Sequence, residues 1–118
     1  MKLVIHNVWT WDCGNLRIWE PADPSIIATT VNVDIGAKGR SGKDTFQLRI
    51  ATPEGLMKIE SRDGIVAIRP LLVLERYYFN DVWRWLQATV AKCEADSWLD
   101  CVANLRRWFD WEYDGMES

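Results

Sequence analysis

The residue types best suited to catalysis lie in the acidic, aromatic segment RRWFDWEYDG at 106–115. Its acids Asp110 and Glu112 could in principle act as the general acid and general base that hydrolyse a glycosidic bond. A general acid needs burial to raise its pKa toward neutrality, whereas a short acidic tail is expected to be exposed. The segment therefore predicts no catalytic pair.

A glycine-rich segment, GAKGRSGKD at 36–44, invites comparison with a phosphate-binding loop. That loop requires four residues between its glycines, and a Ser or Thr after the lysine whose hydroxyl holds magnesium. Here five residues separate Gly36 from Gly42, and Asp44 follows Lys43. Because the segment also lies between two predicted strands, we interpret it as a positively charged hairpin loop.

The sequence contains no pattern typical of a metal site or of a catalytic nucleophile. His6 is the only histidine, and no G-x-S-x-G motif is present, so neither a zinc site nor a nucleophile–base pair is expected. Cys13, Cys93 and Cys101 form no C-x-x-C pair, and we expect them to be reduced core residues. The sequence predicts no enzyme, no bound metal and no cofactor.

Length and charge limit the remaining classes. A chain of 118 residues corresponds to a single domain, 1–118. The formal net charge of -3 disfavours non-specific binding to nucleic acid or to anionic membranes, which needs a positive field. The sequence shows no secretion signal and no apolar run of membrane length, and its cysteine usage suits a reducing compartment. We therefore expect a cytoplasmic protein.

The first two thirds of the chain favour β-strands. Residues 25–35 and 45–50 alternate apolar and polar side chains, which predicts strands with one buried face and one face in water. Asn32 and Asp34 are assigned to the wet face. Further strands are predicted at 2–11, 16–19, 65–69 and 71–78, the last pair forming a central strand because its apolar run is nearly continuous. Pro53 indicates the first position of a short helical turn.

The last third is predicted to be helical. Apolar residues recur at helical spacing over 82–93, with Asn80 or Asp81 as the N-cap. A second helix is predicted from Ser97, where S-W-L-D is similar to a capping box. Its apolar stripe extends to Trp108 and Phe109.

Strands followed by helices predict an α+β fold. We expect an antiparallel β-sheet built from the N-terminal two thirds of the chain, with two C-terminal α-helices packed on it.

Tryptophan and acidic residues supply the functional signals. Eight tryptophans are more than one core easily buries whole, so some are expected to be partly exposed, as interface anchors often are. Residues 94–118 hold seven acids against only Arg106 and Arg107. This imbalance indicates either an ordinary solvated helix face or a field that attracts a basic partner.

Three segments resemble immunity protein family 8 of bacterial polymorphic toxin systems. PADPS at 21–25 and DIGAKGRSGKDTFQLRIATPEGL at 34–56 carry the resemblance. The ending LRRWFDWEYD at 105–114 is similar to that family's C-terminal signature of an aromatic residue followed by W-E-Y and an acid. The resemblance implies a small cytoplasmic protein, encoded beside a toxin, that binds the toxin's C-terminal domain. Contact-dependent growth inhibition is the implied setting, and the toxins are often nucleases with basic clefts.

The leading hypothesis is a non-enzymatic inhibitor that occludes a toxin domain through an acidic surface. Its candidate contact residues lie in the second helix and the tail, at Asp96, Asp100, Asp110, Trp111, Glu112 and Asp114. The basic hairpin loop is the second candidate, with Lys38, Arg40 and Lys43. Two alternatives belong to other classes: a carbohydrate-binding module with exposed tryptophans as stacking platforms, and a single-stranded nucleic-acid binder, which the missing positive groove disfavours.

Overall fold

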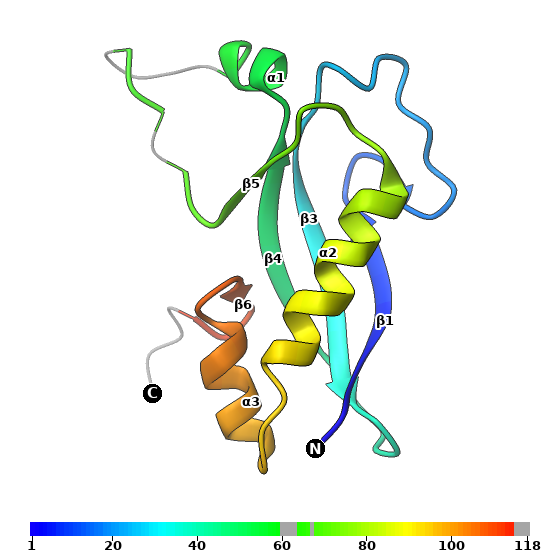
Figure 1. Ribbon diagram of the computed structural model, residues 1–118, viewed down its shortest axis with the longest axis vertical. Coiled ribbons are helices and arrows are strands. Elements are labelled where there is room, and N and C mark those ends of the chain that lie inside the picture. Colours follow the sequence, from blue (N-terminus) through cyan, green and yellow to red (C-terminus); the bar gives the residue numbers. More distant parts are fainter. Residues whose placement is uncertain (60–63, 67, 115–118) are drawn as a thin grey trace.

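The computed structural model describes residues 1–59, 64–66 and 68–114, and its elements form two layers (Figure 1). A six-stranded sheet is one layer, and helices α2 and α3 pack on one face of it. The strands are β1 (Leu3–Thr10), β2 (Gly14–Asn15), β3 (Ala28–Ala37), β4 (Asp44–Ala51), β5 (Leu71–Val73) and β6 (Asp110–Trp111), and the helices are α1 (Pro53–Met57), α2 (Phe79–Lys92) and α3 (Trp98–Leu105). The α+β prediction is confirmed.

The strand order is β2-β1-β3-β4-β5, with β6 also beside β4. All pairs are antiparallel except β4 with β5. The outer edge of β4 is shared, because β5 pairs with residues 49–51 and β6 pairs with residues 46 and 47. The first and last thirds of the chain therefore meet in one sheet. The loop between β3 and β4 spans 38–43, which confirms the predicted hairpin.

The two faces of the sheet differ in chemistry. Val31, Val33 and Ile35 of β3 are fully buried in the cluster that contacts α2 and α3. Asn32 and Asp34 alternate with these residues along β3 and therefore point to the opposite face. No helix of the described residues covers that face (Figure 1). They were expected to face water, but they are only 1% and 7% exposed. That expectation was wrong because neighbouring side chains on the same face bind and cover them, as described below.

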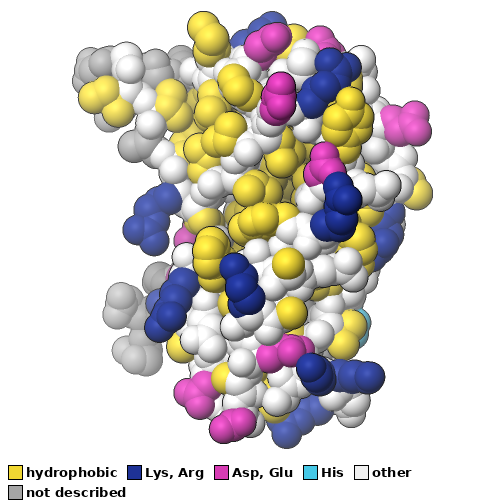
Figure 2. Space-filling view, viewed as in Figure 1, with side chains coloured by type: hydrophobic (Ala, Val, Ile, Leu, Met, Phe, Trp, Pro, Cys, Tyr) yellow, Lys and Arg dark blue, Asp and Glu magenta, His cyan; other side chains and the backbone are white. Residues whose placement is uncertain are grey.

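Helix α2 buries its apolar stripe on the sheet through Val82, Leu86 and Val90. Its N-cap is Tyr78, which makes no side-chain capping bond, so the predicted caps at Asn80 and Asp81 were wrong. The helix begins earlier because its aromatic first residue, Phe79, packs on the core and stacks with Trp83. Figure 2 shows hydrophobic side chains gathered along this helix-bearing face, with charged side chains of both signs around them.

The caps of the two shorter helices agree with the sequence. The Ser97 hydroxyl accepts a hydrogen bond from the Asp100 N–H at the start of α3. The Thr52 hydroxyl accepts one from the Gly55 N–H at the start of α1, directly before Pro53. A side-chain acceptor at the N-cap satisfies a backbone donor that lacks a partner within the helix.

Three predicted strands differ in the structure. Residues 16–19 form no strand, and the end of β1 pairs with the two-residue strand β2, whose first residue, Gly14, has φ 72°. A two-residue strand has no periodicity that a sequence could display. In 71–78 only Leu71–Val73 forms a strand, at the sheet edge rather than its centre, with Leu71 and Val73 exposed on the helix-free face. Of the predicted strand at 65–69, residue 67 lies outside the described residues, and the others form no strand beyond a single bridge.

The end of the second helical stripe also differs. Helix α3 ends at Leu105, and a turn follows it. Phe109 is buried, but Trp108 is 41% exposed and packs edge-on against Trp85 of α2. Helical spacing assigned both residues to the core, and the turn after Leu105 changes the spacing so that only Phe109 reaches it.

Candidate partner-binding surfaces

The C-terminal segment is fastened to β4 by both its backbone and its side chains. Glu112 N–H donates to the Thr45 carbonyl (3.0 Å), and Thr45 N–H donates to Glu112 Oε1 (3.0 Å). The Trp111 indole N–H donates to Asp44 Oδ2 (3.0 Å). Trp111 packs on the core cluster, with Tyr113 edge-on against it. Glu112 and Trp111 therefore have a structural role, because they hold the C-terminal segment on β4.

Asp114 closes the turn that follows β6. Its Oδ2 accepts a hydrogen bond from the Trp111 N–H (2.9 Å), and its Oδ1 pairs with Arg106 at 2.6 Å. Each carboxylate oxygen thus has a partner inside the chain. The pair is partly exposed, so its contribution is mainly to the position of the segment rather than to stability.

Three of the candidate acids have no such role. Asp96, Asp100 and Asp110 are exposed, and within the described residues their carboxylates make no hydrogen bond or ion pair. Asp96 and Asp100 flank the start of α3, whereas Asp110 lies after its end, opposite Gln47 on the helix-free face. The eight-residue helix is about 12 Å long, and Asp110 lies beyond its far end. The six candidate residues are therefore not one continuous patch.

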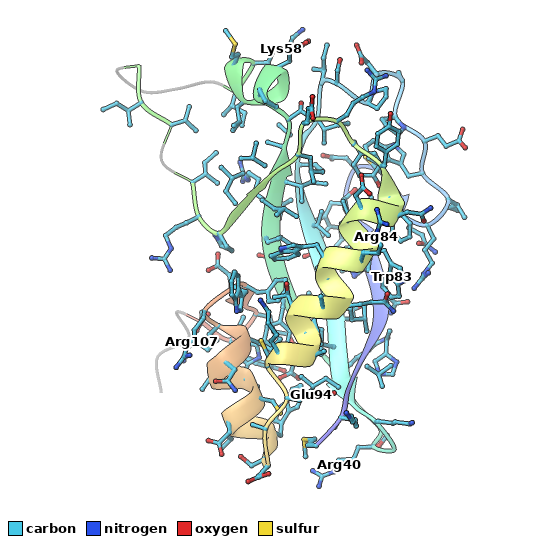
Figure 3. All side chains as sticks on the ribbon, in the orientation of Figure 1. Arg40, Lys58, Trp83, Arg84, Glu94 and Arg107 are labelled. Carbon is cyan, nitrogen blue, oxygen red and sulfur yellow. The ribbon has the colours of Figure 1, made fainter. Side chains whose placement is uncertain are left out.

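The basic loop lies beside the start of α3. Lys38, Arg40 and Lys43 are exposed, and a hollow of about 250 Å³ separates the loop from Trp98, lined also by Gly36, Ala37, Ser41, Gly42 and Asp44. Figures 2 and 3 show acidic and basic side chains mixed at this end of the molecule, with Arg40 at its tip. The structure thus places the second candidate loop next to Trp98, the first residue of the helix that also carries Asp100.

The helix-free face of the sheet carries a hydrogen-bond network that the sequence analysis missed. Asp34 accepts from Asn7 Nδ2 (3.0 Å), Trp9 Nε1 (3.1 Å) and Thr45 Oγ1 (2.7 Å). Gln47 Nε2 donates to Asn32 Oδ1 at 2.7 Å. The network holds polar side chains of three strands in fixed positions. The available signal was the recurrence of polar residues on one face of adjacent strands.

The tryptophans do not form a single platform. Trp11 is 80% exposed and packs edge-on against Trp9 on the sheet, with ring centroids 4.9 Å apart. Trp108 is exposed on the helical layer instead, where the Lys92 ammonium lies 4.7 Å from its ring. None of the eight is fully buried, as expected. The carbohydrate-binding alternative, which uses exposed tryptophans, stays a prediction.

The histidine and the cysteines form no metal site or activated nucleophile among the described residues. His6 is exposed, and no group of three metal-binding side chains occurs within the described residues. All three cysteines are free, and burial raises the pKa of the Cys93 thiol, which disfavours the nucleophilic thiolate. No helix in the described ranges is both long and apolar enough to cross a bilayer.

Comparison with known families identifies the chain. A model of the family described as immunity protein 8 matches residues 3–116. The chain belongs to this family. The match includes the whole sheet, both packed helices and the C-terminal segment that closes on β4. Neither a curated relative nor a solved structure matches this immunity protein 8 chain.

Proposed function

We propose that this immunity protein 8 chain binds a cognate toxin domain and neutralises it by covering it, without catalysis. The family match over residues 3–116 carries the proposal. The structure supports a binding role because its exposed acids and basic loop lie on a folded framework. We place the complex in the cytoplasm, where contact-dependent growth inhibition would deliver the toxin, and we expect no nucleic acid or membrane to take part.

A nuclease is the toxin class that the charges favour. A nuclease cleft is basic because it binds phosphates, and the chain has a net charge of -3 with acids exposed near α3. Complementary charge raises the association rate and suppresses wrong partners. The acids that remain free for this role are Asp96, Asp100 and Asp110. Trp111, Glu112 and Asp114 act at the same surface by holding Asp110 and its strand in place.

The experiment uses the purified C-terminal domain of the toxin encoded beside this chain. Association rates are measured at low and high salt for the native protein and for the triple variant Asp96→Lys, Asp100→Lys, Asp110→Lys. We expect the variant to associate at least about tenfold more slowly at low salt, with a weaker salt dependence. The matched control reverses three exposed acids elsewhere, Glu20, Glu54 and Glu75. Its association rate at low salt should fall much less.

Two negative results have different meanings. If the native protein forms no complex and gives no protection in a toxicity assay, the proposed function is wrong. If it binds and both triple variants behave alike, only the acidic contact surface is wrong. The basic loop then becomes the surface to test, by reversing Lys38, Arg40 and Lys43.

A further inference from the structure

The outer edge of β1 is open. Within the described residues, β1 is paired on that side only by β2, at Trp9 and Thr10, and the Val8 carbonyl accepts from the Leu16 N–H (3.0 Å). Residues 3–7 therefore have no neighbouring strand there. The Lys38 N–H donates to the Lys2 carbonyl (2.9 Å), which directs the backbone groups of Lys2 toward β3. Because these directions alternate along an antiparallel strand, the groups of Leu3 and Ile5 point outward. An open edge of this kind offers hydrogen bonds to an added strand.

An apolar groove follows the same edge. Its volume is about 320 Å³, and it lies between β1 and α2, lined by Leu3, Val4, Ile5, Trp83, Gln87, Val90, Ala91 and Glu94. Figure 3 shows Trp83 on the β1 side of α2 and Glu94 just beyond the end of that helix. Leu3, Ile5 and Trp83 belong to the core side yet are only partly buried. The core is thus incomplete along this edge.

Glu94 occupies the end of the edge at Leu3. Glu94 Oε2 accepts from the Leu3 N–H (2.7 Å), and Glu94 Oε1 lies 3.4 Å from the Lys2 ammonium. The Glu94 carboxylate therefore stands where the carbonyl of a next strand would be, and it ends the free edge at Leu3. At the other end, a register shift between Ile5 and Asn7 interrupts the regular ladder. The regular free edge is short and centred on Ile5.

We propose that an extended segment of the cognate toxin domain docks as an added strand on the outer edge of β1, with alternate apolar side chains in the groove between β1 and α2. This inference rests on the proposed function and names its mode of recognition. The groove ends at Glu94, which is already paired with Lys2 and the Leu3 N–H. The exposed Asp96 lies two residues further along the chain, so a basic residue at that end of the toxin segment would pair with Asp96. The docked strand is thereby continuous with the acidic contact surface.

A second copy of the chain is the other conceivable occupant, and the size of the edge argues against it. A stable interface buries roughly 1,200–2,000 Å² in total. A regular edge of a few residues beside a 320 Å³ groove supplies only part of that area. Such an edge suits one portion of a larger heterologous interface, in which the acids near α3 supply the rest.

The test fills the groove without touching the core. Ala91 lines the groove and is exposed on α2, and Ala88 is exposed on the same helix but does not line it. Ala91→Trp should weaken binding of the purified toxin domain by about tenfold or more, whereas Ala88→Trp should leave the affinity within about twofold. Circular dichroism melts establish that both variants are folded. Hydrogen exchange on the native complex should show new protection of the Ile5 amide.

The outcomes separate this inference from the function on which it rests. Absence of any complex overturns both. A complex in which Ala91→Trp binds as tightly as Ala88→Trp, and in which the Ile5 amide exchanges as fast as in the free protein, overturns the added strand and leaves the inhibitor standing. Ile5 protection that depends on the concentration of the immunity protein alone, together with dimers in sedimentation, assigns the edge to a second copy and overturns the toxin segment as its occupant.

Discussion

Asn32 and Val33 are neighbours in β3, and both are buried, but they are buried by different means. Val33 contacts the apolar cluster beneath α2 and α3, where each large aliphatic side chain contributes roughly 1.5–3 kcal/mol by leaving water. Asn32 and Asp34 lie on the other face, where Gln47, Thr45 and Trp9 cover them through hydrogen bonds. Burial of apolar surface stabilises one face of the sheet, and hydrogen bonds between matched donors and acceptors stabilise the other.

The difference shows how each face tolerates change. An apolar face accepts another side chain of similar volume, because its attraction has no direction. A buried polar network does not, because removing one member leaves its partners without hydrogen bonds. Within the described residues, the buried side-chain polar atom without a partner is the Tyr77 hydroxyl, and it lies on the apolar side.

The largest expected effect is on the apolar side. Phe109→Ala should lower the free energy of unfolding by about 3–5 kcal/mol, because it empties a site packed against Phe46 and Trp85. Urea denaturation followed by circular dichroism measures the loss. The adjacent Trp108→Ala, at a side chain 41% exposed, should cost less than half as much. Equal losses would contradict the assignment of Phe109 alone to the core.

The second largest effect is expected from disrupting the hydrogen-bond network on the polar face. Asp34→Ala removes the acceptor shared by Asn7, Trp9 and Thr45, and should cost about 1–3 kcal/mol. Asp110→Ala, on the same face but exposed and unbound, should stay within about 0.5 kcal/mol. Urea denaturation of both variants measures the difference. If the two variants unfold alike, the network does not stabilise the fold and serves only as a surface.

A smaller effect appears in acid, at the edge where the two layers meet. The hydrogen bond from the Leu3 N–H, followed by that from Lys2, lowers the pKa of Glu94. A carboxylate with a lowered folded pKa stabilises the fold above its unfolded pKa, and this contribution disappears as the pH falls through the folded value. Urea midpoints should therefore fall from neutral pH to about pH 3 less steeply in Glu94→Gln than in the native protein. Glu20→Gln, at an exposed loop residue, should keep the native slope.

The smallest effect at neutral pH is expected at Tyr77. Tyr77→Phe should leave the free energy of unfolding unchanged or slightly raised, because the buried hydroxyl has no partner to lose. A loss above about 1 kcal/mol would reveal a partner for that hydroxyl.

The native protein and Tyr77→Phe should also differ in stability at alkaline pH. Burial raises the pKa of Tyr77 to about 12, so above the ordinary value of about 10 the unfolded chain ionises first. The native protein should lose stability as the pH rises from about 10 toward 12, and Tyr77→Phe should lack that part of the loss. Thermal melts across this range provide the measurement, with the exposed Tyr78→Phe as the control that retains the loss.

The sequence predicted the elements whose faces repeat over many residues. The apolar positions of β3 and α2 recur at periods of two and of about 3.6, so these elements were found from residue types alone. The helix cap at Ser97 and the hairpin loop at 38–43 depend on neighbours in the chain, and they were also predicted correctly.

The failures share one cause, which is partners distant in sequence. Asn32 and Asp34 look like residues of a wet face until β1 and β4 supply their donors. Glu112 looks like a free acid until it meets Thr45, 67 positions away. Of the proposed contact acids, the structure therefore leaves Asp96, Asp100 and Asp110 available, a division that no local pattern records.

The place of β6 also has a consequence for protein synthesis. The two strands β3 and β4 leave the ribosome early and can pair at once, but the outer edge of β4 at residues 46 and 47 waits for residues 110 and 111. A nascent chain that has reached only α3 exposes that edge and the site that Phe109 fills. Translation must therefore pass residue 111 before β6 can pair with β4, and a chain that ends after α3 lacks both β6 and the Phe109 side chain of the core.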